Sequence, residues 1–144
     1  MPPADQDLID ALVRTCFATM AVLNRVGAEH DLSLTQIRLL GILADRRAKM
    51  SELADILGLD KSTVSGLVDR AEKRGLVQRA ANPADGRAVD VFLSPTGTEL
   101  ADRGAALVAR SLSPMTSVLT GTEARRLTTL LEHILPAAPS LRAS

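Results

Sequence analysis

Apolar residues recur with a helical period along most of this chain. From Asp7 to Glu29 they are three and four residues apart, which places them on one face of a helix. Ser33–Gln36 is a capping box, in which a serine and a glutamine side chain satisfy free backbone N–H groups, and a second apolar run follows it. Two shorter runs of the same period come after Ser51 and Asp60. The pattern therefore predicts four helices in succession.

The third and fourth of these helices have the features of a helix-turn-helix. Ser51 and Asp60 are good N-cap residues, and Gly58 and Gly75 supply the left-handed conformation that ends a helix. Ala54 is small where the two helices would cross. The motif needs a small residue at the crossing and a glycine at the turn in about this register.

Beyond Gly75 the apolar period changes to two. Leu76–Ala80 and Val89–Leu93 alternate, which predicts two short strands. The turn dipeptides Asn82-Pro83 and Asp85-Gly86 lie between them and predict a hairpin with a polar tip. A hairpin that follows a helix-turn-helix is a wing, so this order predicts a winged helix-turn-helix and makes DNA the leading partner.

Two further helices complete the predicted fold. Ser94-Pro95 begins the first of them, and Pro114 is expected to kink or end this helix. The capping box Thr120–Glu123 begins the last helix. The fold class is mainly α with a small β-hairpin wing. The ends, residues 1–4 and 137–144, are rich in Pro, Ala and Ser and are expected to be loose.

Length and composition are those of one globular domain. The 144 residues are enough for a single core, and 46% hydrophobic with 24% charged residues is ordinary. No apolar run is long enough to span a bilayer, the first residues lack the layout of a signal peptide, and one cysteine builds no disulfide framework. These features predict a cytoplasmic protein without a membrane partner.

Charge indicates how DNA would be bound. Lys and Arg number 17, as do Asp and Glu, so no global field attracts nucleic acid. Residues 46–87 contain nine basic and six acidic side chains, a local excess of three positive charges. We therefore expect binding through local contacts in this segment.

Several short motifs together resemble the multiple antibiotic resistance regulator (MarR) family of bacterial winged-helix repressors. Their order and spacing, over about Asp7 to Leu135, make the resemblance specific. The motifs are Leu32–Gln36, Ser51–Ala54, Leu59–Ser65, Val68-Asp69, Arg74–Val77, Asp85–Arg87 and Leu93–Gly97.

The resemblance implies a single domain over residues 1–144 that forms a homodimer. Its winged-helix lobe would cover about residues 32–97, and about 7–30 and 98–137 would form dimerisation helices. It also implies a repressor on an inverted-repeat operator, often released by a small molecule bound between the dimer helices and the lobe. Such a cleft is expected to be aliphatic and bordered by Arg14, Arg25 or Arg38.

The resemblance also implies that the fourth helix lies in the major groove. Ser62, Thr63 and Ser65 are the candidates for base edges, and Lys61 and Arg70 for phosphate or guanine. Asp69 is expected on the same exposed face. The family often has an arginine directly after its Thr-Val-Ser motif, where this chain has Gly66, so base readout must use other side chains.

The wing would lie at the minor groove. Arg87 is the candidate for insertion there, because a narrow minor groove is strongly negative. Asp85 is two residues away and is expected to orient the Arg87 guanidinium through a charge-assisted bond.

Other functions remain open beside this one. Cys16 lies on the apolar stripe of the first helix, and one branch of the family senses organic hydroperoxides through a cysteine there. That branch supports its cysteine with tyrosines, which this chain lacks, and a buried apolar cysteine is usually inert. A winged helix can also serve as a protein-interaction module without DNA readout. Nothing in the sequence indicates an enzyme, a cofactor or a metal site.

Overall fold

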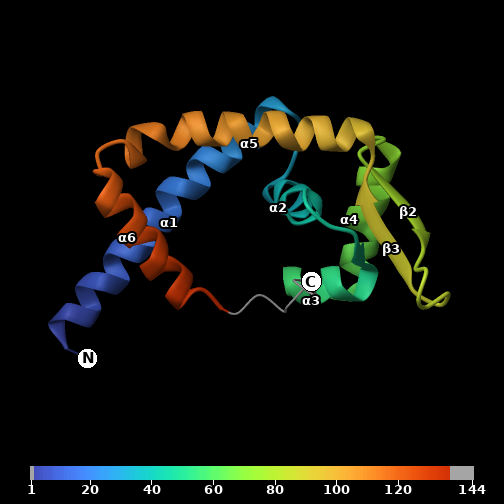
Figure 1. Ribbon diagram of the computed structural model, residues 1–144, viewed down its shortest axis with the longest axis horizontal. Coiled ribbons are helices and arrows are strands. Elements are labelled where there is room, and N and C mark those ends of the chain that lie inside the picture. The colour runs from blue at the N-terminus through green and yellow to red at the C-terminus, as the bar shows by residue number, and fades with distance from the viewer. Residues whose placement is uncertain (1, 137–144) are drawn as a thin grey trace.

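The computed structural model describes residues 2–136, and the expected loose segment 137–144 lies outside this range. Within it, α5 lies along the top of Figure 1 and joins two regions. The winged-helix lobe, made of α2, α3, α4 and the strands, lies on the right, and α1 and α6 lie on the left, where they overlap in this view. This arrangement confirms the predicted fold class. The helices are α1 (Pro3–Glu29), α2 (Leu34–Leu43), α3 (Met50–Leu57), α4 (Lys61–Lys73), α5 (Pro95–Thr116) and α6 (Gly121–Ile134), and the strands are β1 (Ala48–Lys49), β2 (Val77–Ala81) and β3 (Val89–Leu93).

One apolar core holds the lobe together. The stripes predicted for the third and fourth helices are buried, and Leu39 of α2 and Val91 of β3 pack against them. Burial of such a side chain contributes roughly 1.5–3 kcal/mol, so these contacts fix how α3 and α4 cross. The buried stripe residues are Leu53, Ala54, Leu57, Val64, Leu67, Val68 and Ala71.

The turn between α3 and α4 is built as the sequence predicts. Gly58 has φ +65°, and its N–H and that of Leu59 donate to carbonyls in the last turn of α3. A side chain at this φ would be strained, so the glycine permits the sharp change of direction between the two helices.

The wing is part of a three-stranded antiparallel sheet with strand order β1-β3-β2. Val77 lies opposite Leu93, and Ala81 lies opposite Val89. The sequence did not predict β1, whose two residues pair with Val91 and Asp90. β1 connects the start of α3 to the base of the wing.

Two predicted helix boundaries are wrong. The first helix begins at Pro3 rather than Asp7, because proline is well suited to the first helical position. The third helix has Lys49, not Ser51, as its N-cap, and the Glu52 carboxylate accepts from the Lys49 backbone N–H at 3.2 Å. Pro114 does not end α5, which continues to Thr116, and the alternative of a kink stays a prediction.

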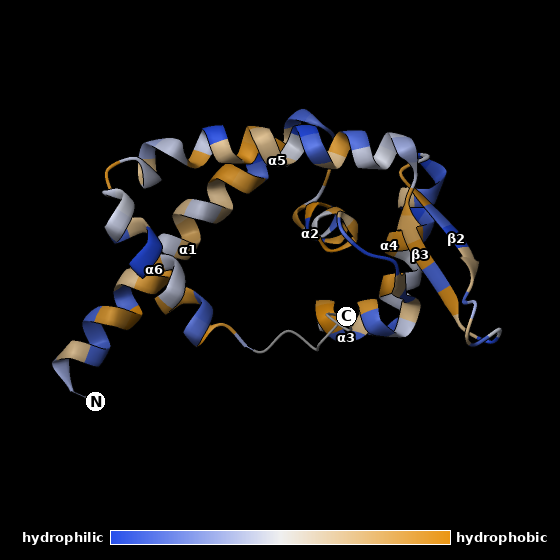
Figure 2. Cartoon of the chain, viewed as in Figure 1, coloured by the Kyte–Doolittle hydropathy of each residue, from blue (hydrophilic) through white to orange (hydrophobic). Residues whose placement is uncertain are grey.

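The helices outside the lobe leave apolar surface uncovered. Figure 2 shows apolar bands that recur along α1, away from the lobe. Leu8, Leu12 and Phe17 of α1 are 62%, 43% and 66% exposed. α6 buries none of its residues, although its apolar face was predicted, and Leu130 is 51% exposed.

Candidate nucleic-acid interface

The first turn of α4 presents the predicted polar side chains to solvent. Lys61, Ser62 and Thr63 are exposed, and Ser65 is half-buried. Asp60 caps the helix by accepting from the Thr63 backbone N–H and from the Ser62 hydroxyl, both at 2.8 Å. The Thr63 N–H and the Ser62 hydroxyl hold the pKa of Asp60 below its ordinary value of 3.8. With its hydrogen donated to Asp60, the Ser62 hydroxyl can act only as an acceptor toward any further partner.

Gly66 leaves space that Arg70 occupies. These residues are one turn apart on α4, and helical side chains lean toward the N-terminus of their helix. A Cβ on Gly66 would lie 3.3 Å from a terminal guanidinium nitrogen of Arg70. The Arg70 guanidinium therefore covers the surface where a side chain at position 66 would begin.

Asp69 lies on the border of the exposed face and is paired to the wing. Its carboxylate accepts from the guanidinium of Arg79 on β2, and the Arg79 Nε is buried without a hydrogen-bond partner among the described residues. The Asp69 side chain is 50% exposed, so it lies at the surface, but its carboxylate is paired with Arg79. The ion pair connects α4 to the wing.

A second group of polar contacts lies at the base of the wing, where sequence analysis placed none. The Asp90 side chain is 6% exposed and accepts from Arg47 Nε at 3.3 Å and from Asn82 Nδ2 at 2.8 Å. The Arg47 guanidinium also lies 4.3 Å from the centre of the Phe92 ring. Sequence analysis missed this site because a polar residue between two valines, as Asp90 is in β3, is expected to face solvent.

The tip of the wing is shaped by side chains that bind its own backbone. Asn82 Oδ1 accepts from the N–H groups of Ala84 and Asp85, each at 2.9 Å. Asp85 Oδ1 accepts from the Arg87 backbone N–H at 3.1 Å, so the aspartate sets the turn that exposes Arg87. The expected orientation of the Arg87 guanidinium by Asp85 stays a prediction.

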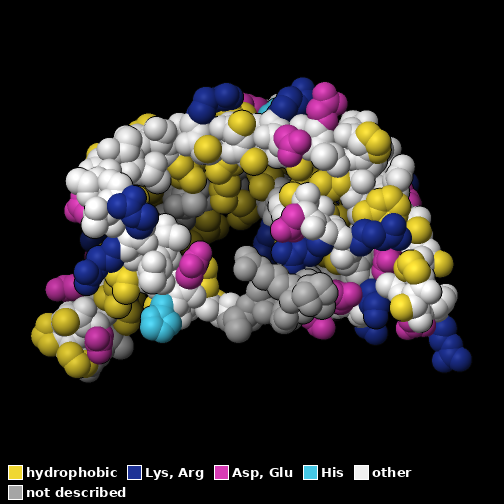
Figure 3. Space-filling view, viewed as in Figure 1, with side chains coloured by type: hydrophobic (Ala, Val, Ile, Leu, Met, Phe, Trp, Pro, Cys, Tyr) yellow, Lys and Arg dark blue, Asp and Glu magenta, His cyan; other side chains and the backbone are white. Residues whose placement is uncertain are grey.

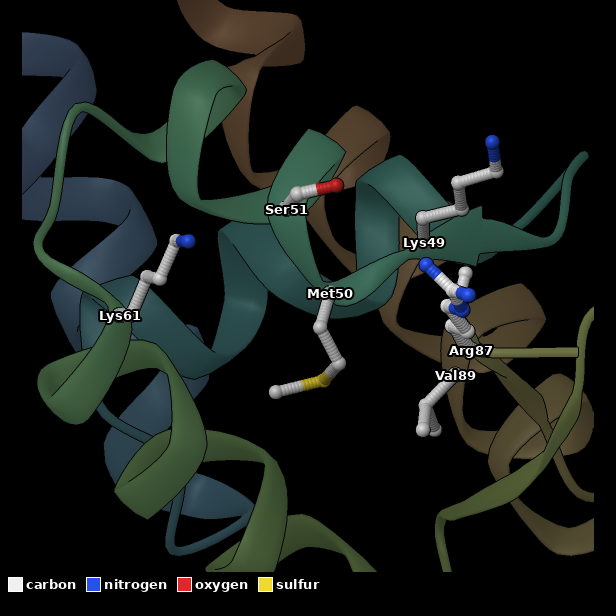
Figure 4. Close-up of a pocket in the computed structure, with 7 residues that line it drawn as sticks. Lys49, Met50, Ser51, Lys61, Arg87 and Val89 are labelled. Carbon is white, nitrogen blue, oxygen red and sulfur yellow. The ribbon is translucent and has the colours of Figure 1, made fainter. Parts of the chain in front are cut away.

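A cavity of about 310 Å³, here called the wing cleft, lies between the starts of α3 and α4 and the wing. Lys61 and Arg87, predicted separately from a helix and a hairpin, both line it. Lys49 and Ser51 line it as well, and neither was singled out as a site residue. Figure 4 shows the charged ends of Lys61 and Arg87 on opposite sides of the opening, with the Ser51 hydroxyl between them. Ser65 and Arg70 are not among its lining residues.

A second cavity of about 350 Å³, here called the helix cleft, lies between α1, α2 and α5. Its walls are aliphatic, with Leu23, Leu40 and Leu100 among them. His30 is the one ionisable side chain among the described residues that line it. The arginines expected at its border do not line it. Arg38 instead donates to the Ile56 carbonyl at 2.9 Å.

Arg74 connects the helix cleft to α4. This residue is the C-cap of α4, and its guanidinium donates to the carbonyl oxygens of Asp31 at 2.6 Å and His30 at 3.0 Å. Asp31 has φ +56°, a conformation that non-glycine residues rarely adopt. The segment that borders the cleft is therefore bonded directly to the end of α4.

Cys16 is exposed, with its Sγ 3.6 Å from the sulfur of Met20. The sequence placed it on a buried stripe, and this expectation is wrong for the single chain. No group of three potential metal ligands occurs among residues 2–136. No described helix is long and apolar enough to cross a membrane.

Residues 30–88 match the family model described as MarR family. The multiple antibiotic resistance protein MarR of Escherichia coli strain K12 is 30% identical over 117 residues, which cover 80% of this chain and 81% of that protein. This chain belongs to the MarR family. The family consists of transcriptional regulators rather than enzymes, and DNA binding follows from membership.

A second relative and a solved structure are also similar to this chain. The transcriptional repressor NicR of Pseudomonas putida is 35% identical over 75 residues, and the chain spans about half of its length (48%). A crystal structure of an E. coli MarR mutant complexed with operator DNA has a TM-score of 0.72 and 26% identity, covering 90% of this chain and 94% of that one.

Proposed function

We propose that this chain is a homodimeric repressor that binds an inverted-repeat operator and is released by a small apolar molecule. The observation that carries the proposal is the wing cleft, because it places Lys61 of the recognition helix and Arg87 of the wing on one opening. The similar MarR structure is complexed with operator DNA, which supports the same use of this lobe.

The uncovered apolar faces of α1 and α6 support a dimer. Phe17 is 66% exposed and Ile134 is 57% exposed, and large exposed side chains follow the helical period along both helices. Contiguous apolar surface of this kind marks an interface. We assign residues 7–30 and 98–137 to dimerisation and residues 32–97 to DNA binding. A second copy of the chain would cover these faces and fix the distance between two recognition helices at about 34 Å, one helical turn of DNA.

The DNA contacts follow from exposure and charge. Ser62, Thr63 and Ser65 would meet base edges, and Lys61 and Arg70 would meet phosphate or guanine. Figure 3 shows basic and acidic side chains interspersed on the viewed face of the lobe, which agrees with binding through local contacts. At the wing, Arg87 would enter the minor groove, held there by the turn that Asp85 shapes.

The helix cleft supports control by an effector. Aliphatic walls and about 350 Å³ of space suit a small apolar ligand rather than a charged one. Because Arg74 bonds the segment beside His30 to the end of α4, a ligand that moves this segment would change the position of the recognition helix. α4 would then have two positions, one that fits the operator and one that does not. At most, the ligand lowers operator affinity by the ratio of its affinities for these two positions.

Fluorescence anisotropy with the intergenic DNA beside the gene, against a scrambled duplex and across a salt series, tests the proposal. We expect selective binding with a steep salt dependence, weakened by Arg87→Ala while the dimer stays intact in light scattering. Equal weak binding to both duplexes would favour a protein-interaction module. Selective binding by a monomer would contradict the dimer.

A further inference from the structure

The charged ends around the wing cleft have no acidic partner. Lys49, Lys61 and Arg87 form no ion pair among the described residues. They come from β1, α4 and the wing, which are separate in sequence, and the fold brings all three to the wall of one cavity of about 310 Å³. A cleft lined by one sign of charge focuses its field on a ligand of the opposite sign.

An acid is close in sequence to each of these cations, but each acid is bonded elsewhere. The Glu52 carboxylate accepts from the Lys49 backbone N–H at 3.2 Å, and Asp60 accepts from the Thr63 N–H and the Ser62 hydroxyl. Asp85 accepts from the Arg87 backbone N–H at 3.1 Å. None of the three acids lines the cleft. The local carboxylates therefore build the turns and caps that hold the cations in place and leave the cleft itself positive.

We infer that the wing cleft holds one phosphodiester group of the DNA backbone, with Lys49, Ser51 and Lys61 as its contacts, while Arg87, on the other side of the opening, reaches into the adjoining minor groove. The Ser51 hydroxyl can donate to a phosphate oxygen, and it lies between the ends of Lys61 and Arg87 in Figure 4. Met50 and Val89 form apolar walls that suit the adjoining sugar. This inference rests on the proposed DNA binding and assigns one part of it.

A phosphate held in this position would fix the register of the protein on the duplex. Contact to the backbone carries no sequence information, but it orients the groups that do. The cleft lies between the start of the recognition helix and the wing, so one phosphate there would set the positions of both reading elements at once.

Lys49→Ala tests this assignment in the salt-series assay with the full-length protein. The logarithm of the DNA association constant K falls linearly with the logarithm of the salt concentration, and loss of one phosphate contact makes this slope less steep by about 0.9. This change corresponds to roughly fivefold weaker binding near 0.15 M salt. We expect the same factor for operator and scrambled duplex, and recovery by Lys49→Arg. Thermal melts of each variant separate loss of contact from loss of fold.

A scan of operators with single methylphosphonate linkages identifies the phosphate. We expect one linkage in each half-site whose neutralisation weakens operator binding by the wild-type protein. The same linkage should cause no further loss of binding by Lys49→Ala. A different outcome is that the wild-type protein binds the operator and every methylphosphonate linkage weakens binding by Lys49→Ala as much as it weakens binding by the wild-type protein. The inference then fails while the proposed function stands. Lys49-dependent binding of inorganic phosphate, without any loss of DNA affinity in the variant, would assign the cleft to a free anion and overturn the inference. If the wild-type protein binds no DNA, both fail.

Discussion

Removal of the Arg47 side chain would show how strongly charge holds the base of the wing. Arg47→Ala leaves the Asp90 carboxylate, 6% exposed, with Asn82 as its remaining side-chain donor. A hydrogen bond to a charged group contributes about 1.5–3 kcal/mol, and a cation–π contact at a partly exposed site adds about 0.5–1 kcal/mol. Breaking a fully buried ion pair costs about 3–5 kcal/mol. Because the Arg47 side chain is 47% exposed, water reaches the carboxylate once the arginine is gone, and the loss should be smaller.

We therefore expect Arg47→Ala to lower the free energy of unfolding by about 2 kcal/mol. Urea denaturation followed by circular dichroism measures this as a lower midpoint with an unchanged slope. Arg46→Ala is the matched control, because Arg46 pairs with Asp45, whose side chain is 74% exposed, and such pairs contribute about 0–1 kcal/mol. Asp90→Asn in the Arg47→Ala background should restore part of the loss by removing the unpaired charge. Equal costs for the two arginine variants would refute the reasoning.

Four further predictions use other parts of the molecule. Gly66→Ala displaces the Arg70 guanidinium, so the preference for operator over scrambled DNA in competition binding should fall by roughly 1 kcal/mol, while the stability of α4 rises. An unchanged preference would exclude Arg70 from base readout. Arg74→Ala should retain operator binding but weaken its response to any ligand of the helix cleft, measured by anisotropy with and without that ligand; an undiminished response would exclude this connection. If Cys16 is a sensor, peroxide should release the wild-type protein from DNA but not Cys16→Ser, and oxidation verified by mass spectrometry without release would exclude the role. Asp60 has a lowered pKa, so its contribution to stability is present above pH 3.8 and is lost as the pH falls through the folded-state pKa. The urea midpoint of Asp60→Asn should lack this acid-dependent loss, and parallel curves of midpoint against pH for the variant and the wild-type protein would contradict the assignment.

Local sequence rules predicted most helix starts because a cap involves residues only three positions apart. The boxes at Ser33 and Thr120 form as expected, and Asp60 caps α4. The same rules failed at Ser51, because Lys49 is held in an extended conformation by pairing of β1 with β3. A two-residue strand has no periodicity of its own, so its existence depends on a partner strand far away in sequence.

The candidate interface was predicted in part. Lys61 and Arg87 were recognised from a helix and a hairpin tip, and the structure brings them to one cleft. Lys49 could not be recognised, because its place in the cleft depends on the pairing of β1. Asp69 was placed on the exposed face by helical period alone, but period does not show that Arg79 of β2 lies within reach.

The sequence by itself determined the order of the helices and of the two wing strands, the buried faces of α3 and α4, and the polar residues at the start of α4 and at the wing tip. Each of these depends on neighbours within one or two helical turns, where steric preference and capping bonds act. The tertiary structure alone decided where the Asp90 carboxylate is buried, which cations share the wing cleft, and that Arg74 bonds the border of the helix cleft. Those features depend on side chains that meet across long separations in the chain, and their geometry is set by the packing of the apolar core.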